Sequence, residues 1–262
     1  MNVLSAKVIF RERSAVDILD LAVRFLVVHG GAFARLSGMV LLPCFVISLV
    51  VAKTVDWFVA WIVAVTLGFL AQVPFTLLAS RLVFQDRVRT REVLKEAISS
   101  TPKILMMRVL TTVGIAASSF FFIIPALYLA SVLFFMNEVV LLERATLGQS
   151  LGRAQKVAAS SLGDAFVGVL IVTVLPALAV VLSEVGGRMI LGELLQFQPP
   201  RPAWEEGGSS LCLFGWFAMI PYVTTSRFFM YLNVRTRAEG WDIQTRFAAI
   251  AALAEAEMGE AS

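Results

Sequence analysis

Long apolar runs dominate this chain, and their length limits the class of structure that it can adopt. The sequence predicts six membrane spans, at about 36–52, 57–78, 104–124, 126–142, 164–183 and 211–232. A helix needs about 20 mainly apolar residues to cross a hydrocarbon core of ~30 Å. Because 58% of the residues are hydrophobic and only 16% are charged, most of the chain must lie in lipid. We therefore expect an all-α integral membrane protein with a single membrane domain, 1–262, and no soluble catalytic module.

Basic residues sort to one side of these six spans. Of the 22 Lys and Arg residues, 19 fall on the side that holds both termini, and only Lys53, Arg188 and Arg201 fall on the other. Since short cytoplasmic loops retain basic residues, both termini are expected in the cytoplasm. The same topology predicts an outer loop at 184–210 and a cytoplasmic tail at 233–262. It also explains the net charge of +3 through attraction to anionic headgroups, so we expect no nucleic-acid partner.

Amphipathic helices are expected on the cytoplasmic face. The segment Ser14-Ala15-Val16-Asp17 has the pattern of a helix start, with a capping hydroxyl and an acid three residues later. Polar and apolar residues then separate onto opposite faces as far as Gly30-Gly31, which are expected to close the helix. Such a helix suits the membrane surface better than a crossing.

A weak internal repeat accompanies these surface helices. The spacing Ser14-x4-Leu19-x2-Ala22 returns as Thr146-x4-Leu151-x2-Ala154 and, more loosely, as Thr90-x3-Leu94-x2-Ala97. Two readings stay open: three units of a surface helix plus a hairpin, or cytoplasmic amphipathic helices that merely look alike.

Four polar residues inside the spans form a candidate intramembrane site. Asn137 and Glu138 lie in the fourth span, Arg227 near the inner end of the sixth, and Gln72 beside a proline in the second. Intramembrane acids are costly and are suspected of function. A structural ion pair between Glu138 and Arg227 would also explain them, and interhelical hydrogen bonds would explain Gln72. The site therefore has a packing explanation and a transport explanation.

Patterns for catalysis or cofactors are not recognisable. Cys44 and Cys212 are expected at depths that do not allow a disulfide, and neither has a second Cys or His at metal-ligand spacing. His29 is the single histidine, without a triad pattern around it. We expect no cofactor and no metal.

The most specific motif follows the last span. It places Tyr231, Arg235, Arg237, Glu239, Gly240 and Asp242 at the spacing Tyr-x3-Arg-x-Arg-x-Glu-Gly-x-Asp. Together with the segment from Ile124 to Glu143 and with Ser150-Leu-Gly-Arg-Ala154, it resembles a bacterial multi-pass family, the membrane domain of glycerophosphoryl diester phosphodiesterases and related domains of unknown function. In that family the resemblance implies that hydrolysis belongs to a separate soluble barrel carrying His and metal-binding acids. This chain looks like the membrane half alone.

A second candidate site lies on the cytoplasmic face. Arg235 and Arg237 could bind anionic headgroups or a partner, while Glu239 and Asp242 could pair with them or with the basic loop of Arg87, Arg89 and Arg91. A stop-transfer anchor explains the same residues.

These observations favour a non-enzymatic protein of the bacterial cytoplasmic (inner) membrane. We expect a scaffold or accessory subunit of an envelope or lipid-related assembly, in contact with anionic lipid and with a membrane-protein partner or further copies of itself. The alternative is a permease for a small solute or lipid that uses Glu138, Gln72 and Arg227.

Overall fold

The computed structural model describes residues 13–85, 88–142, 147–159 and 161–239, and all regular structure in these ranges is helical. The all-α class is therefore confirmed for this part of the chain. The helices are α1 (Ala15–Val28), α2 (Gly30–Thr54), α3 (Trp57–Phe84), α4 (Thr90–Phe121), α5 (Ile123–Val132), α6 (Met136–Leu142), α7 (Leu147–Ala159), α8 (Leu162–Met189), the π-helix η2 (Ile190–Leu194), α9 (Ala203–Glu206) and α10 (Ser210–Glu239).

Five helical segments of the described residues are long and apolar enough to cross a membrane. They are Gly30–Thr54, Trp57–Phe84, Thr90–Phe120, Ile123–Leu142 and Leu162–Leu194. This composition is compatible with a multi-pass membrane protein. The helix α10, which contains the sixth predicted span, is not among the five, because Thr224, Thr225, Ser226 and Arg227 interrupt its apolar sequence.

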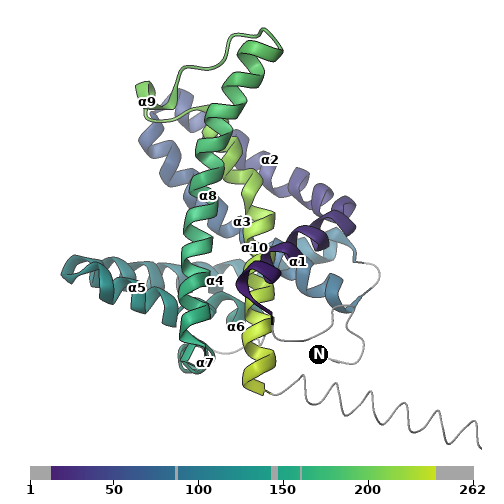
Figure 1. Ribbon diagram of the computed structural model, residues 1–262, viewed down its shortest axis with the longest axis vertical. Helices are drawn as coiled ribbons and strands as arrows, with labels where there is room; N and C mark the ends of the chain where they lie inside the picture. Colours follow the sequence, from purple (N-terminus) through teal and green to yellow (C-terminus); the bar gives the residue numbers. More distant parts are fainter. Residues whose placement is uncertain (1–12, 86–87, 143–146, 160, 240–262) are drawn as a thin grey trace, which may run out of the picture.

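The helix α10 is the central element of the fold. It packs along α8 and also contacts α1, α2 and α3, and in Figure 1 these two long helices run side by side along the vertical axis. A Cβ atom at Gly215 would lie only 2.5 Å from the carbonyl oxygen of Ala179. The small residue therefore lets the backbones of α8 and α10 approach closely, as is common between helices in membranes.

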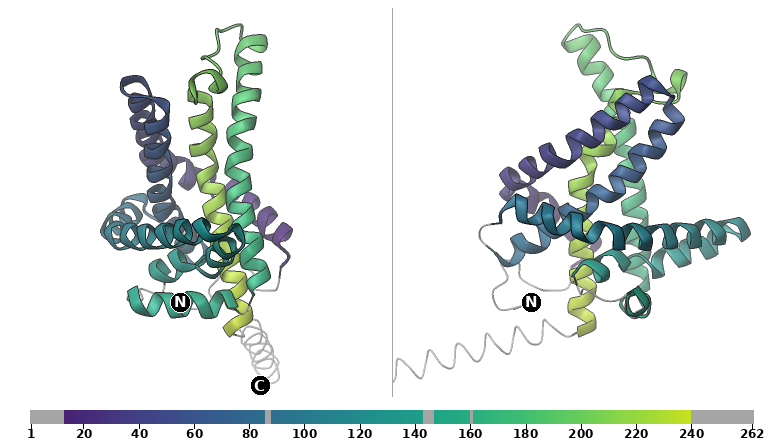
Figure 2. Two further views of the ribbon diagram at one scale, coloured as in Figure 1. Left: turned by 90° about the vertical axis from the view of Figure 1, so that its left-hand side faces the viewer. Right: turned by 180° about the vertical axis from the view of Figure 1, so that it is seen from behind.

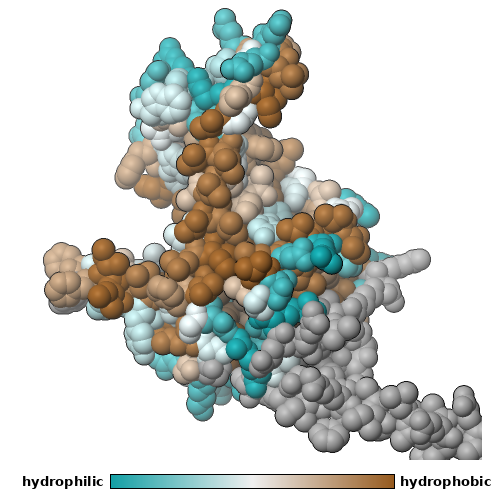
Figure 3. All heavy atoms as spheres, in the orientation of Figure 1, coloured by the Kyte–Doolittle hydropathy of each residue, from teal (hydrophilic) through white to brown (hydrophobic). Residues whose placement is uncertain are grey.

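The hairpin of α4 and α5 lies crosswise to α8 and α10. The two helices pack against each other, and Figures 1 and 2 show them projecting sideways from the central pair. The side chains of Phe120, Phe122, Ile123 and Ile124 at its end are exposed. Figure 3 shows apolar surface over this end and along α8. These surfaces are suited to lipid rather than to water.

The core lies where the C-terminal halves of α3 and α10 meet α1, α2 and α6. Every residue from Ala71 to Ser80 of α3 is buried, and the largest fully buried side chains include Tyr231, Phe75, Phe135 and Phe228. Aromatic rings continue this core into α1, where Phe25 packs edge-on against Phe229 at 5.2 Å between centroids. Edge-to-face contacts of this kind are favourable geometries for buried rings.

The helix start predicted at Ser14 is confirmed. Ser14 accepts a hydrogen bond from the Asp17 backbone, and the Asp17 carboxylate accepts one from the Ser14 backbone. The apolar face of α1 packs on the bundle, with Ile18, Ala22 and Phe25 buried. Burial of this face against protein was not foreseen, since the sequence suggested the membrane surface.

Two predicted boundaries were wrong. Gly30 and Gly31 begin α2 instead of closing α1, because His29 alone turns the chain between the two helices. The fourth predicted span lies within the candidate span Ile123–Leu142, although a turn at residues 133–135 divides it into α5 and α6. The predicted outer loop at 184–210 starts too early, because α8 and η2 continue the helix past Glu184 to Leu194.

Candidate functional site

The predicted intramembrane residues meet at one place, where three helical hairpins converge. Gln72 comes from α3, Asn137 and Glu138 from α6, and Arg227 from α10. The structure adds Arg108 of α4 to this group. We call these five residues the polar junction.

Glu138 and Arg227 form its most buried contact. The Nε atom of Arg227 lies 2.9 Å from Oε1 of Glu138, and the two side chains are 11% and 3% exposed. Arg227 also donates to the carbonyl oxygen of Phe134 and lies over the Phe134 ring, 4.9 Å from its centroid. Arg227 therefore connects α10 both to α6 and to the turn that precedes α6. Breaking such a buried pair by removing one partner is costly, since it leaves an uncompensated charge.

Arg108 joins the junction from α4. Its Nη2 atom donates to Oε1 of Gln72 at 2.9 Å, and its guanidinium lies 4.9 Å from the centroid of the Phe69 ring. With its amide oxygen turned inward, Asn137 accepts from Nη2 of Arg108 at 3.1 Å and from both terminal nitrogens of Arg227 at 3.1 and 3.2 Å. This orientation is assigned from the surrounding donors. Asn137 therefore bridges the two guanidinium groups.

Sequence reasoning did not single out Arg108. The available signal was an arginine one turn inside the third apolar run, which starts at about 104. Its partner Gln72 is 36 residues away in sequence, so no local pattern could connect the two residues.

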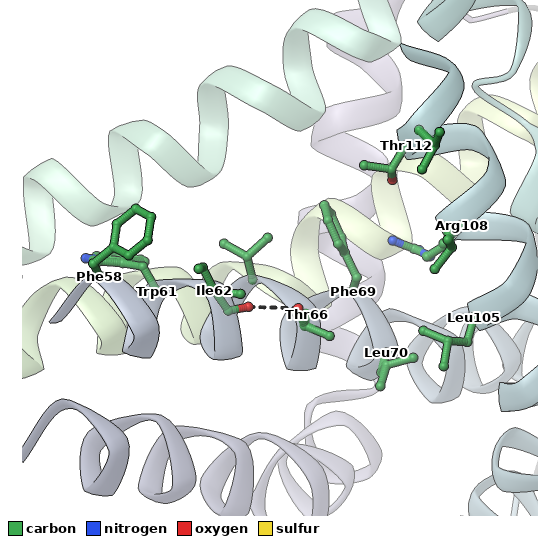
Figure 4. Close-up of a pocket in the computed structure, with 12 residues that line it drawn as sticks. Phe58, Trp61, Ile62, Thr66, Phe69, Leu70, Leu105, Arg108 and Thr112 are labelled. Atoms are coloured by element: carbon green, nitrogen blue, oxygen red, sulfur yellow. Dashed lines mark hydrogen bonds between the residues drawn. The ribbon is translucent and has the colours of Figure 1, made fainter. Parts of the chain in front are cut away.

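Two hollows adjoin the polar junction. A groove of about 500 Å³ runs between α3 and α4, lined by apolar side chains with Arg108 at its inner end; Figure 4 shows it from Phe58 to Arg108. A smaller cavity of about 170 Å³ is lined by Arg108, Asn137 and Arg227 together with threonines and apolar residues. Phe69, Arg108 and Thr112 line both hollows.

The predicted cytoplasmic site is only partly described. Arg237 forms an ion pair with Asp164 at the start of α8, and Arg235 donates to the Tyr231 hydroxyl at 3.1 Å. Arg89 lies 3.8 Å from Glu92, and Arg91 is exposed. Arg87, Gly240 and Asp242 lie outside the described residues, as does the side chain of Glu239. The described members therefore do not converge on one pocket.

The opposite end of the molecule holds a second set of polar contacts. Trp57 and Trp61, at the start of α3, donate to Glu206 Oε2 at 3.2 Å and to the Gly207 carbonyl oxygen at 3.1 Å. Hydrogen bonds from Trp57 and Arg201 hold the pKa of Glu206 below its ordinary value. These contacts attach the segment around α9 to the start of α3.

The described residues include no cluster suited to a metal centre. No group of three or more His, Cys, Asp and Glu side chains there could hold a metal ion. Cys44 and Cys212 are free thiols.

Known proteins add no assignment to this geometry. No family model, curated protein or solved structure matches this chain.

Proposed function

We propose that this protein is a non-enzymatic, multi-pass protein of the bacterial cytoplasmic membrane that acts as a scaffold or accessory subunit of an envelope or lipid-related assembly. The observation that carries this proposal is the buried ion pair of Glu138 with Arg227, 2.9 Å apart. The only intramembrane acid of the polar junction is thereby engaged in joining helices. A general acid or an ion-binding carboxylate would need access to a substrate.

Six crossings with both termini inside remain part of the proposal. The central place of α10 supports its crossing, because a helix surrounded by other helices tolerates polar residues that lipid would not. Arg201 and Arg237 precede and follow the apolar part of α10 and are both exposed. In a background without Cys44 and Cys212, Arg201→Cys should react with an impermeant thiol reagent on whole cells. Arg237→Cys should react only after permeabilisation; labelling of both from the same side would refute the sixth crossing.

A threefold repeat of surface helix plus hairpin is also proposed. One supporting observation is that α3, α6 and α10 each place a polar side chain at the junction: Gln72, Glu138 and Arg227. Another is sequence similarity between 80–91 and 226–237, both of which start Ser-Arg and end Val-Arg-Thr-Arg without a gap. Each of these two segments begins inside a helix, a few residues after a proline of that helix, Pro74 in α3 and Pro221 in α10.

Recovery of a partner tests the scaffold role. When the tagged protein is crosslinked in native membranes and then purified, a membrane-protein partner should be recovered with it in stoichiometric amount. Exchanging Arg235 and Arg237 together for Gln should release that partner, whereas Arg24→Gln should not, since Arg24 is exposed and, among the described residues, pairs with Asp20 of its own helix α1. Recovery of the chain alone from membranes in which it is active would contradict the proposal.

A permease is the second candidate, and the cavity of about 170 Å³ beside Asn137 and Arg227 favours it. Transport would require this cavity to open to both sides of the membrane. Proteoliposomes loaded with radiolabelled inorganic phosphate offer a simple test. Release that depends on Gln72 and Arg227 would favour the permease over the scaffold.

A further inference from the structure

The polar junction contains more positive than negative charge. Two guanidinium groups, Arg108 and Arg227, face one carboxylate, Glu138, and the remaining members Gln72 and Asn137 are neutral. The Nε atom of Arg108 is fully buried and has no hydrogen-bond partner among the described residues. A buried cation without a counter-ion is costly in a medium of low dielectric constant. The junction therefore has a net charge of one positive unit and lacks one counter-anion.

The cavity at the junction has a size and lining suited to an anionic group. Its volume of about 170 Å³ is close to that of the ~150 Å³ engineered cavity known to hold benzene, and a phosphate is not larger than that ring. Arg108 and Arg227 enter it from two different helices, and Thr111 and Thr173 also line it. Guanidinium groups are well matched to phosphate oxygens because they can donate two parallel hydrogen bonds.

The groove next to this cavity has the shape and chemistry of a site for an acyl chain. It follows α3 from Phe58 to Leu70, a length of about 18 Å at the helical rise of ~1.5 Å per residue. That is close to half of a hydrocarbon core of ~30 Å, the length of one leaflet. Its lining is apolar apart from the Arg108 end and two threonines, Thr66 and Thr112. The Thr66 hydroxyl donates to the Ile62 carbonyl oxygen at 2.8 Å, so it does not call for a polar ligand.

We propose that the groove and the cavity together bind an anionic phospholipid. One acyl chain lies between α3 and α4, and the phosphate enters the cavity between Arg108 and Arg227, where it supplies the missing negative charge. The shared lining residues Phe69, Arg108 and Thr112 mark the point where chain and headgroup join. Several side chains that line the groove, among them Phe58, Ile62 and Val109, are exposed, so the second chain of the lipid remains in the bilayer. This binding site does not depend on the proposed scaffold role.

Native mass spectrometry of the full chain in detergent tests the proposal. The probes are dioleoylphosphatidylglycerol and dioleoylphosphatidylcholine, which share their chains and differ in net charge. The protein should bind the anionic lipid about tenfold more tightly, the order of difference expected for one charge-assisted contact. Equal binding of the two lipids would overturn the proposal.

Three variants separate the buried site from surface attraction. Arg108→Gln should abolish the preference for the anionic lipid. Thr66→Trp fills the exposed side of the groove without touching the charged residues, so it should weaken binding of both lipids even if Arg108→Gln fails to fold. Arg89→Gln removes a charge that is 86% exposed and should leave the preference intact. A preference lost with Arg89→Gln and retained with Arg108→Gln and Thr66→Trp would mean binding at the basic surface, and it would refute the groove.

Discussion

The α8–α10 pair and the α4–α5 hairpin are both built from apolar helices, yet they are held in different ways. Along α8 and α10, Gly215 brings the backbones together and Ser183 donates to the Leu211 carbonyl oxygen at 2.6 Å. In the hairpin of α4 and α5, the far end is exposed, with Phe122 at 75%, and the remainder contacts the bundle along α3 and α8 and at the polar junction. Apolar composition therefore identifies helices that can enter lipid but does not say which of them pack together. Shape complementarity holds the first pair, whereas the second is held at its base by buried apolar side chains of α4, among them Val93, Ile104 and Met107, and by the charged contacts of the junction.

The largest expected effect contrasts the two ends of the hairpin. Phe135, at its base, is fully buried and packs against Phe134 and Tyr231. Phe135→Ala should lower the free energy of unfolding by about 3–5 kcal/mol, the usual cost of deleting a buried Phe side chain. Phe122→Ala at the exposed end is the matched control and should change it little. Unfolding in mixed micelles measures both, and equal losses would show that the end of the hairpin is packed as firmly as its base.

Glycine substitutions compare the helix contacts of the two regions. Gly215→Ala places a Cβ atom 2.5 Å from a backbone oxygen of α8, which cannot move aside cheaply. We expect a loss of about 1–3 kcal/mol, typical of overpacking. Gly114→Ala on α4 meets only the Leu129 side chain at 3.7 Å, an ordinary contact, and should be neutral or slightly stabilising. Thermal melting in detergent distinguishes the two, and a Gly114→Ala variant that melts as early as Gly215→Ala would contradict the looser packing of the hairpin.

Helix caps offer a smaller contrast. The helix α1 has a complete capping box at Ser14, whereas α4 begins after Arg89, which makes no side-chain capping bond. Ser14→Ala should cost about 1 kcal/mol, and Arg89→Ser should stabilise by a similar amount because Glu92 already stands three residues later. Melting temperatures check both changes. A lower melting temperature for Arg89→Ser would mean that the Arg89 charge matters more than the cap.

The smallest expected effect lies at the other end of the molecule and depends on pH. Because the folded state holds the pKa of Glu206 below its ordinary value of 4.5, the ionised carboxylate stabilises the fold above that value. The contribution is lost as the pH falls through the lowered pKa. The melting temperature of the wild type should therefore drop slightly more below pH 4.5 than that of Glu206→Gln. Parallel curves for the two proteins would show that the contacts of Glu206 with Trp57 and Arg201 do not affect stability.

Sequence periodicity and apolar runs were sufficient to locate the first five helical spans and the cap at Ser14. They could not reveal that α10, the least apolar of the predicted spans, occupies the centre of the fold. Hydropathy measures transfer from water to lipid, whereas the environment of α10 is set by neighbouring helices. Its polar residues, including Thr225 and Arg227, are tolerated because protein surrounds them.

The candidate site shows the same limit. Gln72, Glu138 and Arg227 could be selected because each is a polar residue in an apolar run. Arg108 did not stand out because it lies near the start of the third apolar run, shortly after Lys103. Basic residues are common at such positions beside a span. The crosswise hairpin and the turn at residues 133–135 depend on contacts between distant helices, for which a single sequence contains no local signal.

A double-mutant cycle on Glu138 and Arg227 asks whether the polar junction holds α6 to α10. The free energy of unfolding is measured for the wild type, for Glu138→Gln, for Arg227→Gln and for the double variant. If the pair is the anchor, each single change should cost about 3–5 kcal/mol, and the double change should cost much less than the sum. If the double variant instead loses the sum of the two single losses in unfolding free energy, Glu138 and Arg227 do not interact. That result would contradict the role of the junction in holding α6 to α10.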